Sequence, residues 1–261
     1  GFVTLIMFFL GLAGVPITFT TVTLTVSAII AAIGIYSFSA KTFCLKLEEF
    51  KIVLPRLDPV EMLLAGLIAI KVIYVFFISI IKPMVDVDAF QQYSIVAKAI
   101  FYDRTFTLPY LHSFCGDKPL LPFLAQGWSF IGLGTINDAL FKIIYPVLFL
   151  CFIVIFYSIL RRAFIRKFCL LFAFMLSSLP FMVYHATTAY ADFTITFYYA
   201  TATFYTYLFM KEFTKDHKVS LRYLMIGLLF LGFAVWAKKA GLVLALVNLL
   251  VLAAFMLFNK K

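Results

Sequence analysis

Long uncharged apolar runs, separated by short charged links, limit the fold of this sequence more than any other feature. Residues 1–38 contain no charged side chain, and only 13% of the 261 residues are charged, against 64% hydrophobic. Soluble domains carry about 25% charged residues. A bilayer is crossed by about 20 apolar residues in a helix, because lipid offers no partner for backbone polar groups. The runs also lack the alternation of membrane strands. The sequence therefore predicts an all-α, polytopic membrane helical bundle.

The positions of the apolar runs predict where the helices lie. Gly11, Gly14 and Pro16 separate a short first segment from the next run. Within the polar stretch 83–118, residues 89–102 have apolar positions at helical spacing, which predicts an amphipathic interfacial helix. The apolar segment 119–133 is short, so it is predicted to be re-entrant or tilted. The predicted spans are 18–38, 60–82, 139–160, 168–184, 192–210, 221–236 and 241–258.

Basic residues are unevenly shared between the links, and this predicts an orientation. With the link 39–58 in the cytoplasm and alternating spans, 14 of the 22 Lys and Arg residues are cytoplasmic, seven are outside and Lys71 lies within a span. This bias follows the positive-inside rule. It predicts a multi-pass protein, with a bacterial plasma membrane expected. Residues 1–58 are interpreted as N-terminal spans with a cytoplasmic basic link, and 59–261 as a second module.

Neither nucleic-acid binding nor a cysteine-based site is predicted. The net charge is +10, but the basic residues lie in links between spans and form no stripe interleaved with aromatic residues. The four cysteines have no paired spacing, so neither a disulfide framework nor a zinc site is implied. The first residue, Gly1, lies inside an apolar run without a basic leader, so we expect the natural chain to begin earlier.

Four aspartates lie in gaps that, by this alternation, open on the outer side: Asp86, Asp88, Asp117 and Asp192. Two interpretations remain open for them. Asp88 or Asp86 caps the following helix, and Asp192 pairs with a helix dipole. Alternatively, these acids form a chemical site, because a carboxylate at a low-dielectric interface has a raised pKa that suits a general base.

Three outer lysines are candidates for phosphate binding. Lys118 stands where an apolar segment begins, so it either snorkels to the interface or binds a lipid phosphate. Lys238 and Lys239 interrupt an apolar stretch on the side that the basic bias disfavours, which points to a function. Lys71, near the middle of a span, is costly unless it is paired with an acid.

Four motifs in a fixed order resemble those of a known family. They are Asp-Ala-Phe-Gln-Gln-Tyr from Asp88, Lys-Pro-Leu-Leu from Lys118, Thr-Ala-Tyr-Ala-Asp ending at Asp192, and Trp-Ala-Lys-Lys-Ala-Gly-Leu around Lys238. Over about residues 60–258 the chain resembles the GT-C superfamily of integral-membrane glycosyltransferases, in particular protein mannosyltransferases and the aminoarabinose transferase.

The resemblance implies an inverting transfer of a sugar from a polyprenyl-phosphate donor to a lipid, protein or glycan acceptor, on the extracytoplasmic face. It implies that Asp88 is the general base, with Asp86 the other member of the acidic pair, and that Asp192 helps to arrange the site. Lys118, with Lys238 or Lys239, is implied to bind the donor phosphate. No cofactor is expected. Some relatives use a divalent metal, but the sequence offers no ligand set for one.

Three departures from the family pattern are visible. Leu120 replaces a Pro after Lys118-Pro119, the acidic pair is Asp-Val-Asp rather than adjacent acids, and fewer spans are present than in the family. The second module is therefore expected to be incomplete on its C-terminal side, which leaves activity of this chain open. The alternatives are a transporter or flippase-like protein and a non-catalytic membrane fragment.

Overall fold

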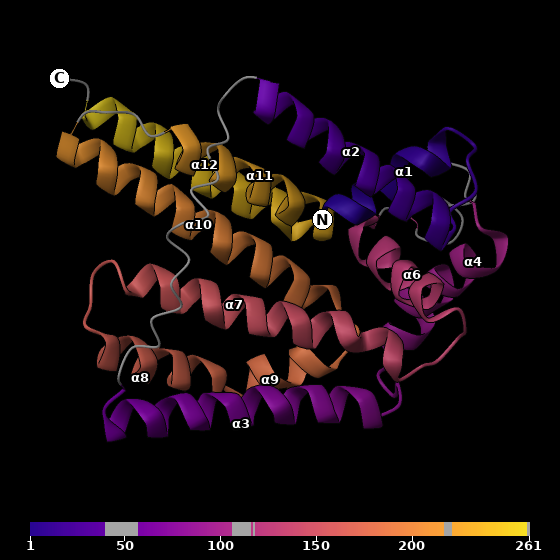
Figure 1. Ribbon diagram of the computed structural model, residues 1–261, viewed down its shortest axis with the longest axis horizontal. Helices are drawn as coiled ribbons and strands as arrows, with labels where there is room; N and C mark the ends of the chain where they lie inside the picture. The colour runs from indigo at the N-terminus through magenta and orange to yellow at the C-terminus, as the bar shows by residue number, and fades with distance from the viewer. Residues whose placement is uncertain (40–56, 106–115, 117, 217–220, 260–261) are drawn as a thin grey trace.

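The computed structural model describes residues 1–39, 57–105, 116, 118–216 and 221–259 (Figure 1). These residues form helices and no strand. The helices are α1 (Phe2–Leu12), α2 (Phe19–Ser39), α3 (Pro59–Ile81), η2 (Ala89–Ser94), α4 (Ile95–Asp103), α6 (Leu121–Leu133), η3 (Leu140–Ile143), α7 (Ile144–Leu160), α8 (Arg166–Ser177), α9 (Pro180–Thr187), α10 (Ala191–Asp216), α11 (Leu221–Ala237) and α12 (Ala240–Phe258).

Four helical segments of the described chain are long and apolar enough to cross a membrane: Phe19–Tyr36, Pro59–Ile81, Leu140–Leu160 and Ala240–Phe258. Only 6–28% of the residues in these segments are buried within the bundle, which leaves side chains available for contact with lipid. The predicted helical membrane bundle is therefore confirmed, and the predicted spans 18–38, 60–82, 139–160 and 241–258 coincide with these segments.

The other predicted spans differ in shape from the prediction. The segment predicted as 168–184 is a pair, α8 and α9, bent by 62° at a short break. The bend arises because Pro180 begins α9 and cannot donate a backbone hydrogen bond to the preceding turn. α10 contains many Thr and Tyr residues, which lower its hydropathy, and α11 has only 17 residues.

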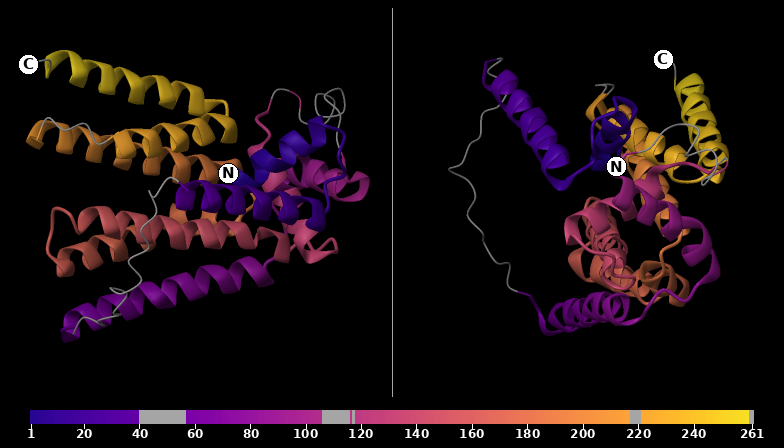
Figure 2. Two further views of the ribbon diagram at one scale, coloured as in Figure 1. Left: turned by 45° about the horizontal axis from the view of Figure 1, so that its top comes forward. Right: turned by 90° about the vertical axis from the view of Figure 1, so that its right-hand side faces the viewer.

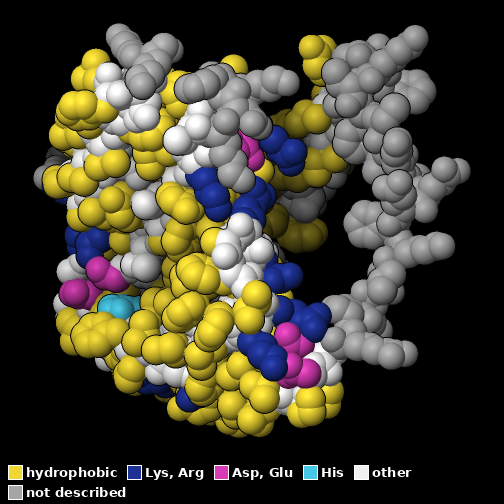
Figure 3. Space-filling model, turned by 90° about the vertical axis from the view of Figure 1, so that its left-hand side faces the viewer, with side chains coloured by type: hydrophobic (Ala, Val, Ile, Leu, Met, Phe, Trp, Pro, Cys, Tyr) yellow, Lys and Arg dark blue, Asp and Glu magenta, His cyan; other side chains and the backbone are white. Residues whose placement is uncertain are grey.

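The long helices run in alternating directions along the bundle, in the order α3, α7, α8 with α9, α10, α11 and α12 (Figure 1). The bundle therefore has two different ends. α3, α7 and α8 lie on one side, and α10, α11 and α12 on the other (Figures 1 and 2). We call the end where α3 and α8 begin the basic end, because Lys and Arg side chains gather on it (Figure 3). The opposite end, where α4 and α6 lie, is called the acidic end because Asp86, Asp88 and Asp192 lie there (right in Figure 1). Its predicted extracytoplasmic location rests on the positive-inside rule and stays a prediction.

The N-terminal helices belong to the same bundle as the rest of the described chain. Phe2 of α1 packs edge-on against Phe233 of α11, with ring centroids 5.5 Å apart. Phe19 at the start of α2 stacks on Trp128 of α6, also at 5.5 Å. These contacts join α1 and α2 to the helices of the acidic end, while the predicted division of the chain at residue 58 stays a prediction.

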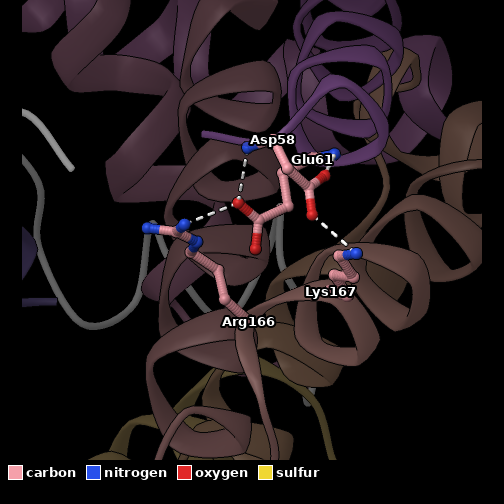
Figure 4. Close-up of polar contacts among 4 residues, drawn as sticks. All are labelled: Asp58, Glu61, Arg166 and Lys167. Carbon is pink, nitrogen blue, oxygen red and sulfur yellow. Dashed lines mark hydrogen bonds and ion pairs between the residues drawn. The ribbon is translucent and has the colours of Figure 1, made fainter. Parts of the chain in front are cut away.

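At the basic end, two ion pairs join the first turns of α3 and α8 (Figure 4). Lys167 Nζ lies 2.6 Å from Asp58 Oδ2, and Arg166 Nη2 lies 2.6 Å from Glu61 Oε2. Asp58 and Glu61 also form a capping box, in which each side chain accepts a hydrogen bond from the other residue's backbone amide. The box satisfies amides that have no partner within the helix, so the start of α3 is set by the sequence Asp-Pro-Val-Glu.

The Asp58–Lys167 pair predicts a loss of stability in acid. The hydrogen bond from Lys167, followed by the one from the Glu61 backbone amide, holds the pKa of Asp58 below its usual range. The carboxylate therefore stabilises the fold above the unfolded-state pKa of about 3.9, and this stabilisation is lost as pH falls through the lower folded-state pKa. Thermal unfolding of purified protein in detergent, measured across that range, is expected to show a smaller acid-induced drop in Tm for Asp58→Asn than for the wild type.

The exposed Asp103, which forms no ion pair within the described chain, provides the control for this measurement. Asp103→Asn is expected to retain the acid-induced drop of the wild type. Identical Tm profiles for Asp58→Asn and the wild type would show that the pair contributes nothing to stability.

Candidate active site at the acidic end

The three predicted catalytic acids within the described residues lie together at the acidic end. Asp86 and Asp88 follow the end of α3, and Asp192 lies in the first turn of α10. Burial raises the pKa of the Tyr190 hydroxyl, and the negative charges of Asp86, Asp88 and Asp192 raise it further. One hydroxyl group therefore senses all three carboxylates, which come from two distant parts of the sequence. The fourth acid, Asp117, lies outside the described residues.

Asp88 does not cap the helix that follows it, although it stands at the N-cap position of η2. Its backbone is already helical and its side chain makes no capping hydrogen bond. Instead, Asp88 Oδ1 accepts a hydrogen bond of 3.2 Å from Gln92 Nε2. The capping interpretation is therefore wrong for Asp88, and the carboxylate is directed to a side-chain partner.

Lys118 joins this contact from another part of the chain. Lys118 Nζ donates to Gln92 Oε1, and it lies 5.7 Å from the centre of the Tyr93 ring. The side chain of Gln92 therefore connects a carboxylate and an ammonium group, with an aromatic ring beside them. The structure thus brings together Asp88 and Lys118, whose proximity the resemblance implies but the sequence does not establish.

Asp192 and Lys238 form an ion pair between α10 and the end of α11. Their Nζ and Oδ1 atoms are 2.5 Å apart, and both side chains are about half exposed. Asp192 also lies in the first turn of α10, where the helix dipole favours a negative charge. Both sequence interpretations of Asp192, dipole pairing and a place in a site, are compatible with this position. Lys239 is exposed at the N-cap position of α12.

Asp86 has a different environment from the other two acids. The Tyr184 hydroxyl of α9 donates to Asp86 Oδ1 at 2.9 Å, and Lys82 Nζ lies 5.9 Å from the centre of the Tyr184 ring. Asp86 and Asp88 therefore each accept a side-chain hydrogen bond, Asp86 from Tyr184 and Asp88 from Gln92.

Lys142 is a residue of this end that the sequence interpretation did not single out. Its side chain is only 2% exposed, and its ammonium donates to the carbonyl oxygens of Lys82, at 2.5 Å, and Thr187, at 3.4 Å. These carbonyls stand at the C-terminal ends of α3 and α9, where a cation is favoured. Lys142 thus holds together the two segments that lead to the three acids. In the sequence, only its position beside the apolar residue Phe141 indicated that Lys142 could be buried.

Tyr93 was also missed, although it ends the Asp-Ala-Phe-Gln-Gln-Tyr motif. Its ring packs against Phe123 of α6, with centroids 5.2 Å apart. Burial raises the pKa of the Tyr93 hydroxyl to about 12, with further contributions from the charges of Asp192 and Asp88. The Tyr93 hydroxyl therefore stays protonated at neutral pH, within the electrostatic influence of Asp192 and Asp88.

An apolar pocket of about 500 Å³ lies between α1, α6, α7 and α10. Two of its lining residues, Leu121 and Thr194, lie within one helical turn of Lys118 and Asp192 in the sequence. The wall of the pocket is mainly apolar, and no acid or lysine of the site is among its lining residues. The wall residues include Val3, Ala125, Trp128, Ile144, Leu148 and Tyr198.

Deep in the same region, Gln126 links α6 to α7 and to the segment before α10. Its Nε2 donates to the Tyr145 hydroxyl at 2.7 Å and to the Ala189 carbonyl at 3.1 Å, and its side chain is fully buried. A hydrogen-bonded amide in an apolar interior restricts how these helices can pack. Gln126 therefore supports the wall of the pocket and the approach to Asp192.

Two further predictions concern Lys71 and metal ions. Lys71 is half-buried in the middle of α3 and forms no ion pair with an acid among the described residues. The described residues also contain no group of three or more His, Cys, Asp or Glu side chains placed to hold a metal ion.

The chemistry of the acidic end follows from its residues. It combines a carboxylate able to accept a proton, ammonium groups able to neutralise a phosphate, and an apolar pocket able to hold a hydrocarbon chain. No family model, curated protein or solved structure matches the chain.

Proposed function

We propose that this chain is a membrane glycosyltransferase of the GT-C type, which moves a sugar from a polyprenyl-phosphate donor to an acceptor at the extracytoplasmic face. Asp88 acts as general base, and Lys118 binds the donor phosphate. The observation that carries the proposal is that Asp88 and Lys118 bind the same Gln92 side chain, and that Leu121, three residues after Lys118, lines an apolar pocket. These are the groups that a lipid-linked phosphate donor and a hydroxyl acceptor need.

The proposed reaction is a single displacement. Asp88 removes the proton from an acceptor hydroxyl group. At the same time, the oxygen of that hydroxyl group bonds to the anomeric carbon of the sugar. The bond between this carbon and the phosphate oxygen breaks on the opposite face, which inverts the configuration. The departing polyprenyl phosphate keeps the electron pair, and Lys118 stabilises its negative charge.

Asp192 and Lys238 take a supporting part in this proposal. Their ion pair places a second ammonium group at the acidic end, and the carboxylate keeps Lys238 directed towards α10. A bound phosphate would share Lys238 with Asp192. Lys239, exposed beside it, is the alternative second cation.

The apolar pocket supports the choice of a lipid-linked donor. Its volume of about 500 Å³ suits the first units of a hydrocarbon chain, and its wall is apolar apart from a few hydroxyl groups. A soluble nucleotide-sugar donor would require polar partners for a base and a ribose, which these lining residues do not provide.

A transporter is the second candidate, and two observations favour it. Lys71 lies at mid-span, and buried Thr206 and Asn248 lie between α10 and α12. Transporters place polar groups near the bilayer centre. However, Thr206 Oγ1 bonds to the Ala202 carbonyl at 2.9 Å and to Asn248 Oδ1 at 3.1 Å. These groups satisfy one another across a helix interface, so the transferase is favoured.

The deciding experiment incubates membranes that contain the full-length protein with a panel of labelled polyprenyl-phosphate sugars, with and without a chelator. Transfer of label to an acceptor above the level of membranes lacking the protein is expected. Movement of intact substrate across sealed vesicles without bond cleavage would support the transporter instead. Loss of transfer in the presence of the chelator would show that the reaction requires a divalent metal ion.

Replacing Lys118 by Met is expected to reduce kcat for transfer by about 10²-fold, the usual loss when one stabiliser of a developing oxyanion is removed. Lys98→Met is the matched control, because Lys98 lies at the same end but pairs with Asp138 at 2.8 Å. Its rate is expected to stay near that of the wild type. Equal losses in the two variants would remove Lys118 from the phosphate site.

A further inference from the structure

Gln92 has the one side chain in the described structure that bonds both to Asp88 and to Lys118. We propose that Gln92 is a positioning residue, which fixes the separation of the general base and the phosphate-binding lysine. This inference rests on the proposed function. It assigns a role to a residue that the sequence motifs do not distinguish from its neighbour Gln91.

The backbone around Gln92 is held from both sides. Gln92 lies in η2, a π-helical segment, and such segments occur frequently at functional sites. The next helix, α4, buries Val96, Ala97 and Ile100 at its interface with α6, the helix that Lys118 precedes. The amide is therefore fixed by packing on one side and by Lys118 on the other.

The chemistry of a primary amide explains why this residue type fits here. A Gln side chain donates through Nε2 and accepts through Oε1 at the same time, and it is neutral. It can therefore bind a carboxylate and an ammonium group without changing the charge of either. A Glu side chain would still accept from Lys118, but it cannot donate to Asp88 when ionised. Its negative charge would raise the pKa of Asp88.

Other charged and titratable groups lie at this end of the bundle, and a substitution at Gln92 leaves their identities unchanged. They include Asp86 before η2, Tyr93 within η2, Lys118 before α6, Tyr190 between α9 and α10, and the ion pair of Asp192 in α10 with Lys238, which follows α11. A change in the pH profile of Gln92→Glu is therefore attributed to residue 92 only by comparison with a control variant that keeps the same surrounding groups.

Gln91 provides this control. It is exposed, precedes Gln92 directly and makes no hydrogen bond through its side chain within the described chain. Gln91→Glu adds the same charge one residue away and leaves both contacts of Gln92 intact. Membrane insertion and expression of the two variants are expected to match.

Two measurements on the full-length protein in membranes test the inference. In the first, the acid limb of the pH profile of kcat/KM is expected to move up by about one pH unit in Gln92→Glu, while Gln91→Glu follows the wild type. In the second, carbodiimide labelling of Asp88 is followed against pH by mass spectrometry. The carbodiimide attacks the protonated carboxyl group. The pH at the midpoint of the labelling curve is therefore expected to rise by a similar amount in Gln92→Glu only.

The two measurements separate the inference from the proposed function. Coincident profiles and labelling midpoints for Gln92→Glu and Gln91→Glu would overturn the role of Gln92. Absence of sugar transfer in the wild type would overturn the proposed function. The labelling midpoints would still show whether Gln92 controls the charge of Asp88.

Discussion

Replacing Asp88 by Asn is expected to reduce kcat for sugar transfer by about 10²- to 10⁴-fold, the usual contribution of a positioned general base. The amide keeps the size of the side chain and still accepts a hydrogen bond from Gln92, so the local geometry is retained. It cannot take a proton from the acceptor hydroxyl. Transfer by membranes containing equal amounts of each protein measures the effect, with radiolabelled donor at saturating concentration.

Two other aspartates provide comparisons for this experiment. Asp103→Asn changes an exposed acid at the end of α4, outside the proposed site, and is expected to leave the rate unchanged. Asp86→Asn alters the acid that accepts from Tyr184 and is expected to have a smaller effect than Asp88→Asn. Wild-type transfer by Asp88→Asn, at equal protein levels in the membrane, would eliminate Asp88 as the base.

Replacing Gly241 by Ala is expected to destabilise the hairpin of α11 and α12 by about 1–3 kcal/mol or more, the range for overpacked interiors. A Cβ atom built on Gly241 would lie 2.9 Å from the Cα atom of Val235 and closer still to the carbonyl group of Ala234. Since these are backbone atoms, no side-chain rotation relieves the overlap. The turn between the helices must open, and Lys238 would move away from Asp192.

Gly232 in the same hairpin is the matched control, because a Cβ atom there would meet nothing within 4 Å. Gly232→Ala is expected to keep or slightly raise the Tm, since Ala favours helix by up to about 1 kcal/mol over Gly. Thermal unfolding of the purified proteins in detergent measures both variants. A Tm for Gly241→Ala equal to that of Gly232→Ala would show that the hairpin adjusts without cost.

The Gly241 result also bears on the motif Trp-Ala-Lys-Lys-Ala-Gly-Leu. The sequence suggested that its lysines matter, and the structure gives the glycine a reason of its own. It allows α11 and α12 to approach closely just after Lys238, which forms the ion pair with Asp192. A combined loss of stability and transfer in Gly241→Ala is therefore expected.

Part of the candidate site was predictable because its residues break a local pattern. Asp88, Asp192 and Lys238 are ionisable residues at the borders of apolar runs, and such positions are costly without a function or a partner. Their common location at one end follows from the alternation of helices, and the structure brings them together as that alternation predicts. Their chemical roles remain to be tested by the substitutions above.

Other parts of the site were not predictable, because their meaning depends on partners distant in the sequence. Gln92 and Gln91 are identical residues side by side, and only the contact with Lys118 distinguishes them. In the sequence, Lys142 does not differ from the other outer lysines. Only the structure shows that its ammonium group lies between the ends of α3 and α9. The sequence is also compatible with Asp88 as a helix cap. Only the structure excludes capping, because the Asp88 side chain makes no capping hydrogen bond.

Hydropathy is a property of short segments, and the cost of placing backbone in lipid applies to each segment separately. The sequence alone therefore predicted a helical membrane bundle and the positions of most of its helices. Hydrogen bonds and ion pairs depend instead on distances of a few ångströms between segments that packing brings together. The pairing of Asp192 with Lys238, the bridge at Gln92 and the pocket beside them consequently became visible only in the folded arrangement.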